Sequence, residues 1–275
     1  YVPVYELPDM KYKDLGKHIS NLIPLSDQEE VISVVAVTDF NLDQDIFMAS
    51  KNGMIKRTKI RDFKVSRYSK PLVAMKLKKD DLLIAADKTL YNDVFIATEK
   101  GYGLWFDMNE VPIVGLKTGG VKAINLKDDT VSSVSNFDSE KIEYISLITD
   151  KSTGKRMKLS EFDKSTRARR GLMILKEVKT NPYHVLKTFV IDQKHYIGLL
   201  ASDITYMKLT ELPILDRYST GSSIAKKPIL SAFVKEEVKN VQQEQSTEIK
   251  PERVQKQISL KEIDDQLMSI DDFLN

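Results

Sequence analysis

Few side chains in this sequence have the type and spacing that catalysis needs. The three histidines, at positions 18, 184 and 195, lie too far apart for a local zinc motif, and there is no cysteine. The sequence contains no Gly-rich phosphate loop and no Gly-x-Ser-x-Gly turn. The acidic pairs Asp80-Asp81 and Asp128-Asp129 follow apolar runs at matching places, which predicts strand-end turns. The residues therefore predict neither a catalytic nor a metal site.

Positively charged residues, by contrast, recur at a regular spacing. One cation stands every 50 residues, and three or four residues after each comes a Gly or Pro. The four cations are Arg67, Lys117, Arg167 and Arg217, followed by Pro71, Gly120, Gly171 and Gly221. The pair Lys56-Arg57 returns as Lys155-Arg156, 99 residues later. Adjacent like charges favour contact with a polyanion or with water. For the four periodic cations, pairing with acidic groups such as Asp62, Glu161 and Glu211 is the structural alternative.

The charge is divided unevenly along the chain. The whole sequence has 42 basic and 40 acidic residues, but from Lys235 onward there are ten acidic residues and only six basic ones. Residues 1–234 therefore carry a net charge of +6 and the tail a net charge of −4. A basic body indicates a polyanionic partner, although this charge alone favours nucleic acid only slightly.

The elements that must position these cations form an internal repeat. An apolar, β-rich run precedes each cation, and two of these runs end in the Gly turns 50–53 and 98–101. Ser152 stands at the corresponding turn position of a later unit, where we expect a different turn. Five units of about 50 residues are predicted, the first lacking an opening strand that would lie before Tyr1. The four runs are 46–49, 94–97, 144–148 and 196–200.

No unit is large enough to bury a core alone, so the units predict an all-β, propeller-like array of four-stranded sheets. There is no Trp-Asp dipeptide and no double-glycine kelch signature. At the Lys56-Arg57 position, two units carry Trp105-Phe106 and Tyr206-Met207 instead. Trp105 is expected to pack between neighbouring sheets.

Three segments resemble the C-terminal domain of the bacterial type IIA topoisomerase A subunits. Residues 50–57 match a T-x-x-G-x-x-K-R turn, 67–71 match an R-x-x-x-G loop, and 74–81 match an apolar strand with an acidic turn. The resemblance covers about residues 1–233. Segments 117–127 and 167–182 are more similar to topoisomerase IV than to gyrase, and residues 4–7 with 13–18 are similar to the same subunit in Gram-positive bacteria. No Gln-Arg-Arg-Gly-Gly-Lys-Gly box is present.

The resemblance implies a β-pinwheel, in which neighbouring sheets exchange strands, and sequence-independent binding and bending of double-stranded DNA along its outer edge. It implies that this part of the protein is non-catalytic and needs no cofactor of its own. ATP and Mg²⁺ would serve a cytoplasmic A2B2 holoenzyme, formed by an ATPase B subunit with the rest of the A subunit. That holoenzyme would pass one duplex through another. Gyrase-type wrapping of DNA is the alternative within the family, and a protein-binding propeller is the alternative of another class.

The predicted DNA-binding residues cluster in two units, with fewer between them. They are Lys56, Arg57, Lys59, Arg61, Lys64, Arg67, Lys70, Lys117, Lys122, Lys155, Arg156, Lys158, Lys164, Arg167, Arg169, Arg170, Lys176 and Lys179.

Three regions are predicted along the chain. Residues 1–233 form the pinwheel and 234–257 a disordered linker rich in Gln, Glu and Lys. Residues 258–275 form an acidic amphipathic helix, because apolar residues recur there at spacings of three and four. That helix could dock, or compete with DNA for the basic edge, but a frayed, solvated end is the preferred interpretation. No apolar run approaches the roughly 20 residues of a membrane helix, and the start at Tyr1 suggests a fragment.

Overall fold

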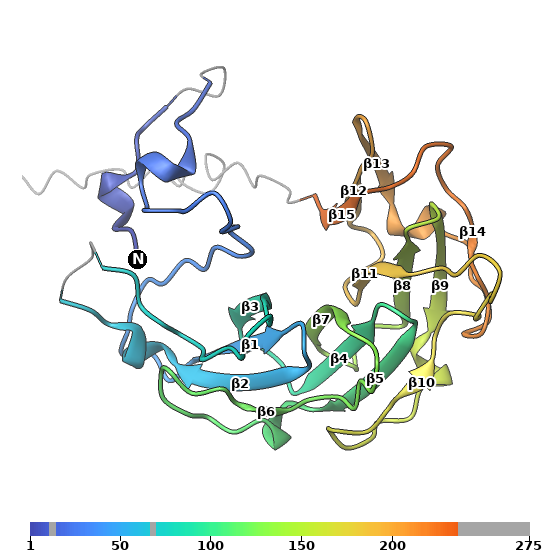
Figure 1. Cartoon of the computed structure of the whole chain (residues 1–275), viewed down its shortest axis with the longest axis horizontal. Coiled ribbons are helices and arrows are strands. Elements are labelled where there is room, and N and C mark those ends of the chain that lie inside the picture. The colour runs from blue at the N-terminus through green and yellow to red at the C-terminus, as the bar shows by residue number, and fades with distance from the viewer. Residues whose placement is uncertain (11–14, 67–69, 236–275) are drawn as a thin grey trace, which may run out of the picture. The chain divides into compact units, whose positions relative to one another are not determined.

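The computed structural model describes residues 1–10, 15–66 and 70–235. Four antiparallel β-sheets follow one another in chain order through this part of the chain (Figure 1). The strands are β1 (Asp45–Ser50), β2 (Met54–Lys59), β3 (Leu83–Lys88), β4 (Asp93–Thr98), β5 (Tyr102–Asp107), β6 (Val121–Lys122), β7 (Val131–Phe137), β8 (Tyr144–Thr149), β9 (Thr153–Lys158), β10 (Leu172–Met173), β11 (Val185–Phe189), β12 (Tyr196–Leu200), β13 (Ile204–Lys208), β14 (Ser222–Ser223) and β15 (Ser231–Val234). Short 3-10 turns connect them: η1 (Val4–Glu6), η2 (Ile19–Asn21), η3 (Ile60–Phe63), η4 (Met108–Glu110), η5 (Leu159–Glu161) and η6 (Leu209–Glu211).

Neighbouring sheets are linked by exchanged strands, as the sequence predicted. The first sheet has the order β3-β1-β2-β6, although β6 follows the hairpin of the second sheet in the chain. In the same way β10 joins the second sheet and β14 the third. The fourth sheet contains only β13, β12 and β15 among the described residues. Each repeat therefore completes the sheet of the repeat before it.

The hydrophobic cores lie between sheets rather than inside one. Phe47 and Ile55 of the first sheet pack with Val94 and Phe106 of the second. Corresponding clusters join the second sheet to the third and the third to the fourth. Trp105 is half-buried against the second of these clusters, which confirms its expected packing role. Since no sheet buries its apolar face alone, the sheets depend on one another for stability.

The turns of the first three hairpins each have a residue with positive φ at the same place. Gly53 and Gly101 have φ values of 77° and 87°, as expected for tight turns. Ser152 has φ 57°, so the expectation of a different turn there was wrong. Its hydroxyl donates to the carbonyl of Lys227 and accepts from the amide of Ile229 (2.8 and 3.0 Å). These two bonds hold a non-glycine residue in the turn.

The acidic strand-end turns accept hydrogen bonds from the hairpin turns. Asp81 accepts the amide of Asn52 (2.9 Å), and Asp129 accepts the amide of Lys100 (3.0 Å). Both carboxylates also accept the amide of the following residue. The prediction that these pairs are structural is confirmed.

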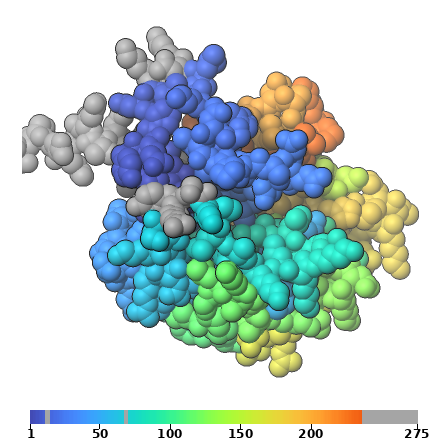
Figure 2. Space-filling view, turned by 60° about the vertical axis from the view of Figure 1, so that its left-hand side comes forward, coloured from blue at the N-terminus to red at the C-terminus, as the bar shows by residue number. Residues whose placement is uncertain are grey.

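The first predicted unit forms no sheet within its described residues. Between positions 1 and 44, the described part holds only η1 and η2 and no strand. Residues 31–37 have a strand-like sequence, but they pair with no strand among the described residues. Val35, Val37 and Phe40 instead pack on the core of the first sheet. Figure 2 shows this blue segment against the cyan surface of the first repeat. The described sheets therefore number four, not five.

The boundary of the last sheet differs slightly from the prediction. Strand β15 includes Val234, which had been assigned to the linker. The predicted linker beyond Lys235 and the predicted helix at 258–275 lie outside the described residues.

Substituting Gly171 tests the strand exchange. A Cβ at this residue would lie 2.3 Å from the carbonyl oxygen of Gly103, and its φ is 80°. Gly171→Ala is therefore expected to lower the free energy of unfolding by at least about 2 kcal/mol in denaturant titrations. Gly115→Ala is the control, because nothing lies within 4 Å of a Cβ there and its φ is not in the left-handed region. Equal stability of the two variants would show that the close approach of β10 to β5 is unimportant.

Candidate nucleic-acid interface

The predicted basic residues divide into structural and exposed groups. The second strand of each hairpin places side chains alternately toward the core and toward the surface. Lys56 and Lys155 point inward and are fully buried. They therefore do not present an ammonium to DNA, which corrects the prediction for these two lysines.

The buried lysines hold the loop of the following repeat. Lys56 Nζ donates to the carbonyls of Ala74 and Gly115, each at 2.8 Å. Lys155 Nζ donates to the carbonyls of Asp216, Arg217 and Ser219 at 3.1, 2.6 and 3.0 Å. Burial lowers the pKa of Lys56, and it lowers the pKa of Lys155 to about 8. The ammonium groups thus donate to carbonyls of these loops and help to hold the loops in place.

Strand pairing also corrects the alignment of the repeats. Arg57, Trp105 and Arg156 occupy the same place, since each carbonyl accepts an amide from the loop of the following repeat. The residue at the position of Lys56 in the second sheet is therefore Leu104, and Trp105 replaces Arg57. In the fourth sheet, Thr205 and Tyr206 occupy these two positions. The sequence alignment was one residue out of register in both units.

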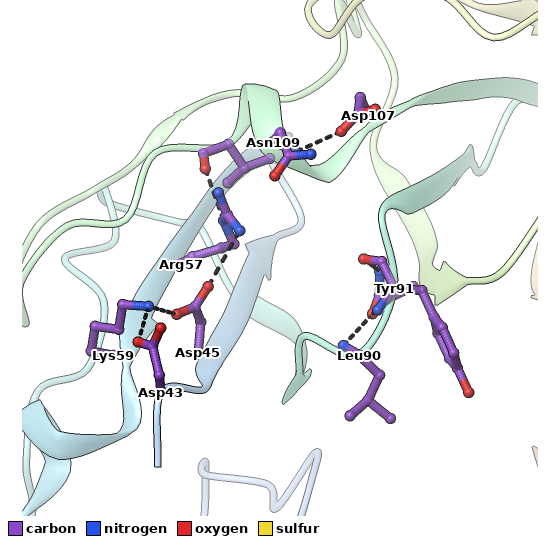
Figure 3. Close-up of polar contacts among 10 residues, drawn as sticks. Asp43, Asp45, Arg57, Lys59, Leu90, Tyr91, Asp107 and Asn109 are labelled. Carbon is purple, nitrogen blue, oxygen red and sulfur yellow. Dashed lines mark hydrogen bonds and ion pairs between the residues drawn. The ribbon is translucent and has the colours of Figure 1, made fainter. Parts of the chain in front are cut away.

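Three predicted cations are engaged by carboxylates. Lys59 Nζ lies 2.8 Å from both Asp43 and Asp45, and Arg57 lies 3.3 Å from Asp45 (Figure 3). The hydrogen bond to Asp43 is the main cause of the raised pKa of Lys59. Lys164 contacts Asp93 at 2.8 Å and Asp107 at 2.9 Å.

Lys164 supplies a positive charge that the second sheet lacks on its own strand. Asp107 stands in the strand position that Lys59 holds in the first sheet. Its cation comes instead from the next repeat, and the hydrogen bond from Lys164 is the main cause of the lowered pKa of Asp107. Burial opposes ionisation of Asp93, but its hydrogen bonds, led by Lys164, bring its pKa below the usual value. Lys164 therefore neutralises carboxylates rather than extending the basic edge.

Besides Arg57, which also donates to the carbonyl of Val111, three further arginines of the predicted set donate to backbone carbonyls. Arg156 donates to the carbonyl of Leu212 at 2.7 Å, and Arg167 donates to those of Glu110 and Lys122 at 3.1 and 3.0 Å. Arg170 donates to the carbonyls of Asn125 and Leu126 and stacks on Tyr102. Carboxylates contact the backbone amides of the periodic arginines, Glu110 that of Arg167 and Glu161 that of Arg217. The side chains of Arg167 and Arg217 thus bind carbonyls and form none of the described ion pairs, so pairing of these charges with acidic groups, the structural alternative, is not what holds them.

Nine predicted cations remain exposed and form no ion pair with any other described residue. We call them the free cations: Arg61, Lys64, Lys70, Lys117, Lys122, Lys158, Arg169, Lys176 and Lys179. Arg67 lies outside the described residues. Lys76, Lys78 and Lys79 are also exposed and were left out, because their segment was assigned to a strand and its turn. The three lysines within four residues could have indicated an exposed basic segment from the sequence alone.

Within the described ranges, no group of three or more His, Asp or Glu side chains could hold a metal ion. The same residues contain no helix long and apolar enough to cross a membrane.

The fold and its exchanged strands match a known family. The family model described as "DNA gyrase C-terminal domain, beta-propeller" matches residues 1–38, 44–89, 92–138 and 143–191. The chain therefore belongs to this family, and the predicted resemblance is confirmed. Its curated relatives include the A subunits of DNA topoisomerase 4 from Bacillus subtilis, 40% identical over 225 residues, and from Staphylococcus epidermidis, 35% identical over 228 residues. These alignments cover 81% and 82% of this chain but only 28% of each relative.

Two solved structures of C-terminal domains have a similar fold. A crystal structure of the C-terminal domain of DNA topoisomerase IV superposes with a TM-score of 0.81 at 40% identity, covering 85% of this chain and 75% of that one. The C-terminal domain of DNA gyrase A gives a TM-score of 0.69 at 21% identity, covering 81% and 76%. The second similarity concerns the fold alone. Of these two domains, the chain is more similar to that of topoisomerase IV.

The pKa of Lys155 predicts a pH dependence. Because the folded-state pKa is about 8 and the unfolded value about 10.5, the unfolded state binds more protons between these values. The contribution of Lys155 to the free energy of unfolding therefore increases as the pH rises from 8 to 10.5, and it decreases as the pH falls from 10.5 to 8. Relative to Lys155→Met, the free energy of unfolding of the unmodified chain is expected to gain up to about 3 kcal/mol over this range. Denaturant titrations at pH 8, 9 and 10 measure it, and parallel pH profiles would contradict it.

Proposed function

We propose that this chain binds double-stranded DNA without reading its sequence, as the non-catalytic DNA-binding domain of a type IIA topoisomerase A subunit. The observation that carries the proposal is the set of nine free cations, left over after every structural cation has been accounted for. Exposed cations that form no ion pair can replace the counterions of DNA phosphates, and this contact needs no base recognition. The family membership supports the same conclusion.

The free cations favour bending of DNA over uniform wrapping. Arg61, Lys64 and Lys70 follow the first hairpin, and Arg169, Lys176 and Lys179 follow the third. The loop after the fourth hairpin carries exposed Glu211 and Asp216, while its Arg217 donates to the carbonyl of Met173. A duplex held at two main contacts bends between them. The gyrase-type alternative requires a more continuous basic edge.

The wider role follows from the relatives. We propose that the chain acts with an ATPase B subunit, and with the rest of its own A subunit, in an A2B2 enzyme that uses ATP and Mg²⁺. In the cytoplasm, at the nucleoid, this domain would present a DNA segment for double-strand passage, and so support decatenation, relaxation and chromosome segregation.

The affinity of residues 1–275 for a duplex of about 150 base pairs, measured across a salt series, tests the proposal. If six of the nine free cations contact phosphates, log K is expected to fall against log salt with a slope of about −5. Absence of binding at low salt for both 1–275 and 1–235 would overturn it. Salt-insensitive binding to a protein partner, without DNA affinity, would then support the protein-binding propeller.

A topological assay separates the two family functions. Relaxed plasmid is incubated with the chain and a type I topoisomerase, and the change in linking number is measured. Bending at two contacts is expected to leave the linking number nearly unchanged, whereas wrapping shifts it in proportion to bound protein. A shift of that kind would favour the gyrase-type alternative.

A further inference from the structure

The first and third hairpins each insert a lysine ammonium into the loop of the following repeat. Lys56 Nζ donates to the carbonyl of Gly115 at 2.8 Å, and Lys155 Nζ donates to the carbonyl of Asp216 at 3.1 Å. The two carbonyls correspond, because each stands at the same distance before the positive-φ glycine of its exchanged strand. The loops of these two repeats therefore bind an ammonium at one equivalent place.

The next residue of each hairpin adds a second cationic donor. Arg57 Nε donates to the carbonyl of Val111 at 2.9 Å, and Arg156 Nε donates to the carbonyl of Leu212 at 2.7 Å. These two carbonyls also stand at equivalent places in their loops. Each of the two loops is thus held by a lysine and an arginine side by side.

The second hairpin has neither of these cations. Leu104 stands in place of the lysine, and Trp105 stands in place of the arginine. The indole of Trp105 donates instead to the carboxylate of Asp93 at 2.8 Å. The corresponding loop carbonyls, those of Phe162 and Thr166, accept no hydrogen bond from a described residue. This loop therefore has the acceptors of the other two without their cationic donors.

A cavity of about 640 Å³ lies between this hairpin and this loop. Leu104, Trp105 and Phe162 contribute apolar surface to its lining, and Asp163 and Thr166 contribute oxygen atoms. Its volume is in the range of cavities that bind small molecules. The cavity thus combines an apolar wall with free hydrogen-bond acceptors at the place where the other loops bind an ammonium.

We propose that this cavity binds a primary alkylammonium cation of about the length of a lysine side chain, namely a free diamine or the end of a polyamine. Its ammonium would donate to the carbonyl of Thr166, as Lys155 donates to that of Asp216. Its methylene chain would pack on Leu104 and Trp105. The apolar lining favours an alkylammonium over a metal ion, which would find few oxygen ligands there.

The charges of the lining are compatible with a positive ligand. Lys164 contacts two carboxylates, and Arg170 donates to two backbone carbonyls. Among the described lining residues, Arg169 is an exposed cation without an ion pair, and Asp163 is an exposed carboxylate without one. These two opposite charges offset each other, so the lining carries no large excess of positive charge.

The fluorescence of Trp105 can report binding at the cavity wall, because this residue is the single tryptophan of the chain. Residues 1–275 are titrated with 1,5-diaminopentane at constant ionic strength and without DNA. The fluorescence is expected to change saturably, with a Kd of about 1 mM. The matched neutral ligand is 1,5-pentanediol, which is expected to bind at least tenfold more weakly.

Two substitutions of Leu104 locate the ammonium. Leu104→Lys supplies an ammonium from the chain itself, at the position of Lys56 and Lys155, and is expected to weaken diamine binding at least tenfold. Leu104→Met is the matched control, because methionine is of similar length but uncharged, and it is expected to keep the Kd within threefold. Circular dichroism checks the fold of both variants. If Leu104→Lys does not fold, the comparison of diamine and diol on the unmodified chain still decides.

Four outcomes would overturn the proposal. The first is the absence of a saturable change with the diamine, or an equal change with the diol. The second is a saturable response to inorganic phosphate instead, which would make the cavity an anion site. The third is an equal loss of binding in the two Leu104 variants. The fourth is at least tenfold tighter binding of a lysine-containing peptide, which would assign the cavity to a partner protein's side chain. The titration contains no DNA, so its outcome is independent of the proposed function.

Discussion

Changing Arg169, Lys176 and Lys179 together to Glu is expected to weaken binding of a 150-base-pair duplex by about 100-fold or more at 0.15 M salt. All three side chains are exposed and form no ion pair with another described residue. Each phosphate contact contributes about 0.9 to the slope of log K against log salt, so losing three contacts lowers its magnitude by about 2.7. The measurement is the salt series on the unmodified chain and on the variant.

The matched control changes Lys141, Lys194 and Lys227 to Glu. These lysines are exposed, lie outside the predicted set, and give the same change in net charge. Two of them pair with Asp138 and Asp203 in surface ion pairs, which contribute little to stability. The control is expected to reduce affinity less than tenfold and to keep the original slope. Equal losses in the two variants would mean that net charge, rather than the placement of the free cations, governs binding.

Lys155→Glu is expected to lower the free energy of unfolding by more than about 4 kcal/mol. The substitution buries a carboxylate among the carbonyl oxygens of Asp216, Arg217 and Ser219, which repel its negative charge. The loop of the fourth repeat would lose one of its attachments to the third sheet. Denaturant unfolding followed by circular dichroism measures the loss.

Lys158→Glu is the control on the same strand, because Lys158 is exposed and forms no ion pair with a described residue. It is expected to change stability by no more than about 0.5 kcal/mol. Similar stabilities for the two variants would contradict the structural role given to Lys155. Lys155 and Arg156 are accordingly unsuitable for mapping a DNA surface by charge reversal, since any loss of binding would follow from unfolding.

The local patterns of the sequence predicted the hairpins well. The runs beginning at Ile46 and Val94 lie within β1 and β4, and the turn glycines that follow adopt positive φ. These features depend on alternation and on glycine, which act over a few residues. The strand beside each hairpin, such as β3 or β7, was not located. Its pairing joins residues about 30 to 40 positions apart, and no local pattern specifies that partner.

The repeat and its motifs, which the sequence contains in full, determined the family, the all-β class and the exchange of strands between units. The division of the cations was decided by tertiary structure alone. Lys155 and Lys158 lie on one strand and are both lysines in a basic segment, yet one is buried and the other exposed. The difference arises because strand β9 turns alternate side chains toward a loop about 60 residues later in the chain, whose carbonyls accept hydrogen bonds from Lys155. The charge of a lysine is local, but whether that charge meets a carbonyl, a carboxylate or solvent depends on which distant segment packs beside it.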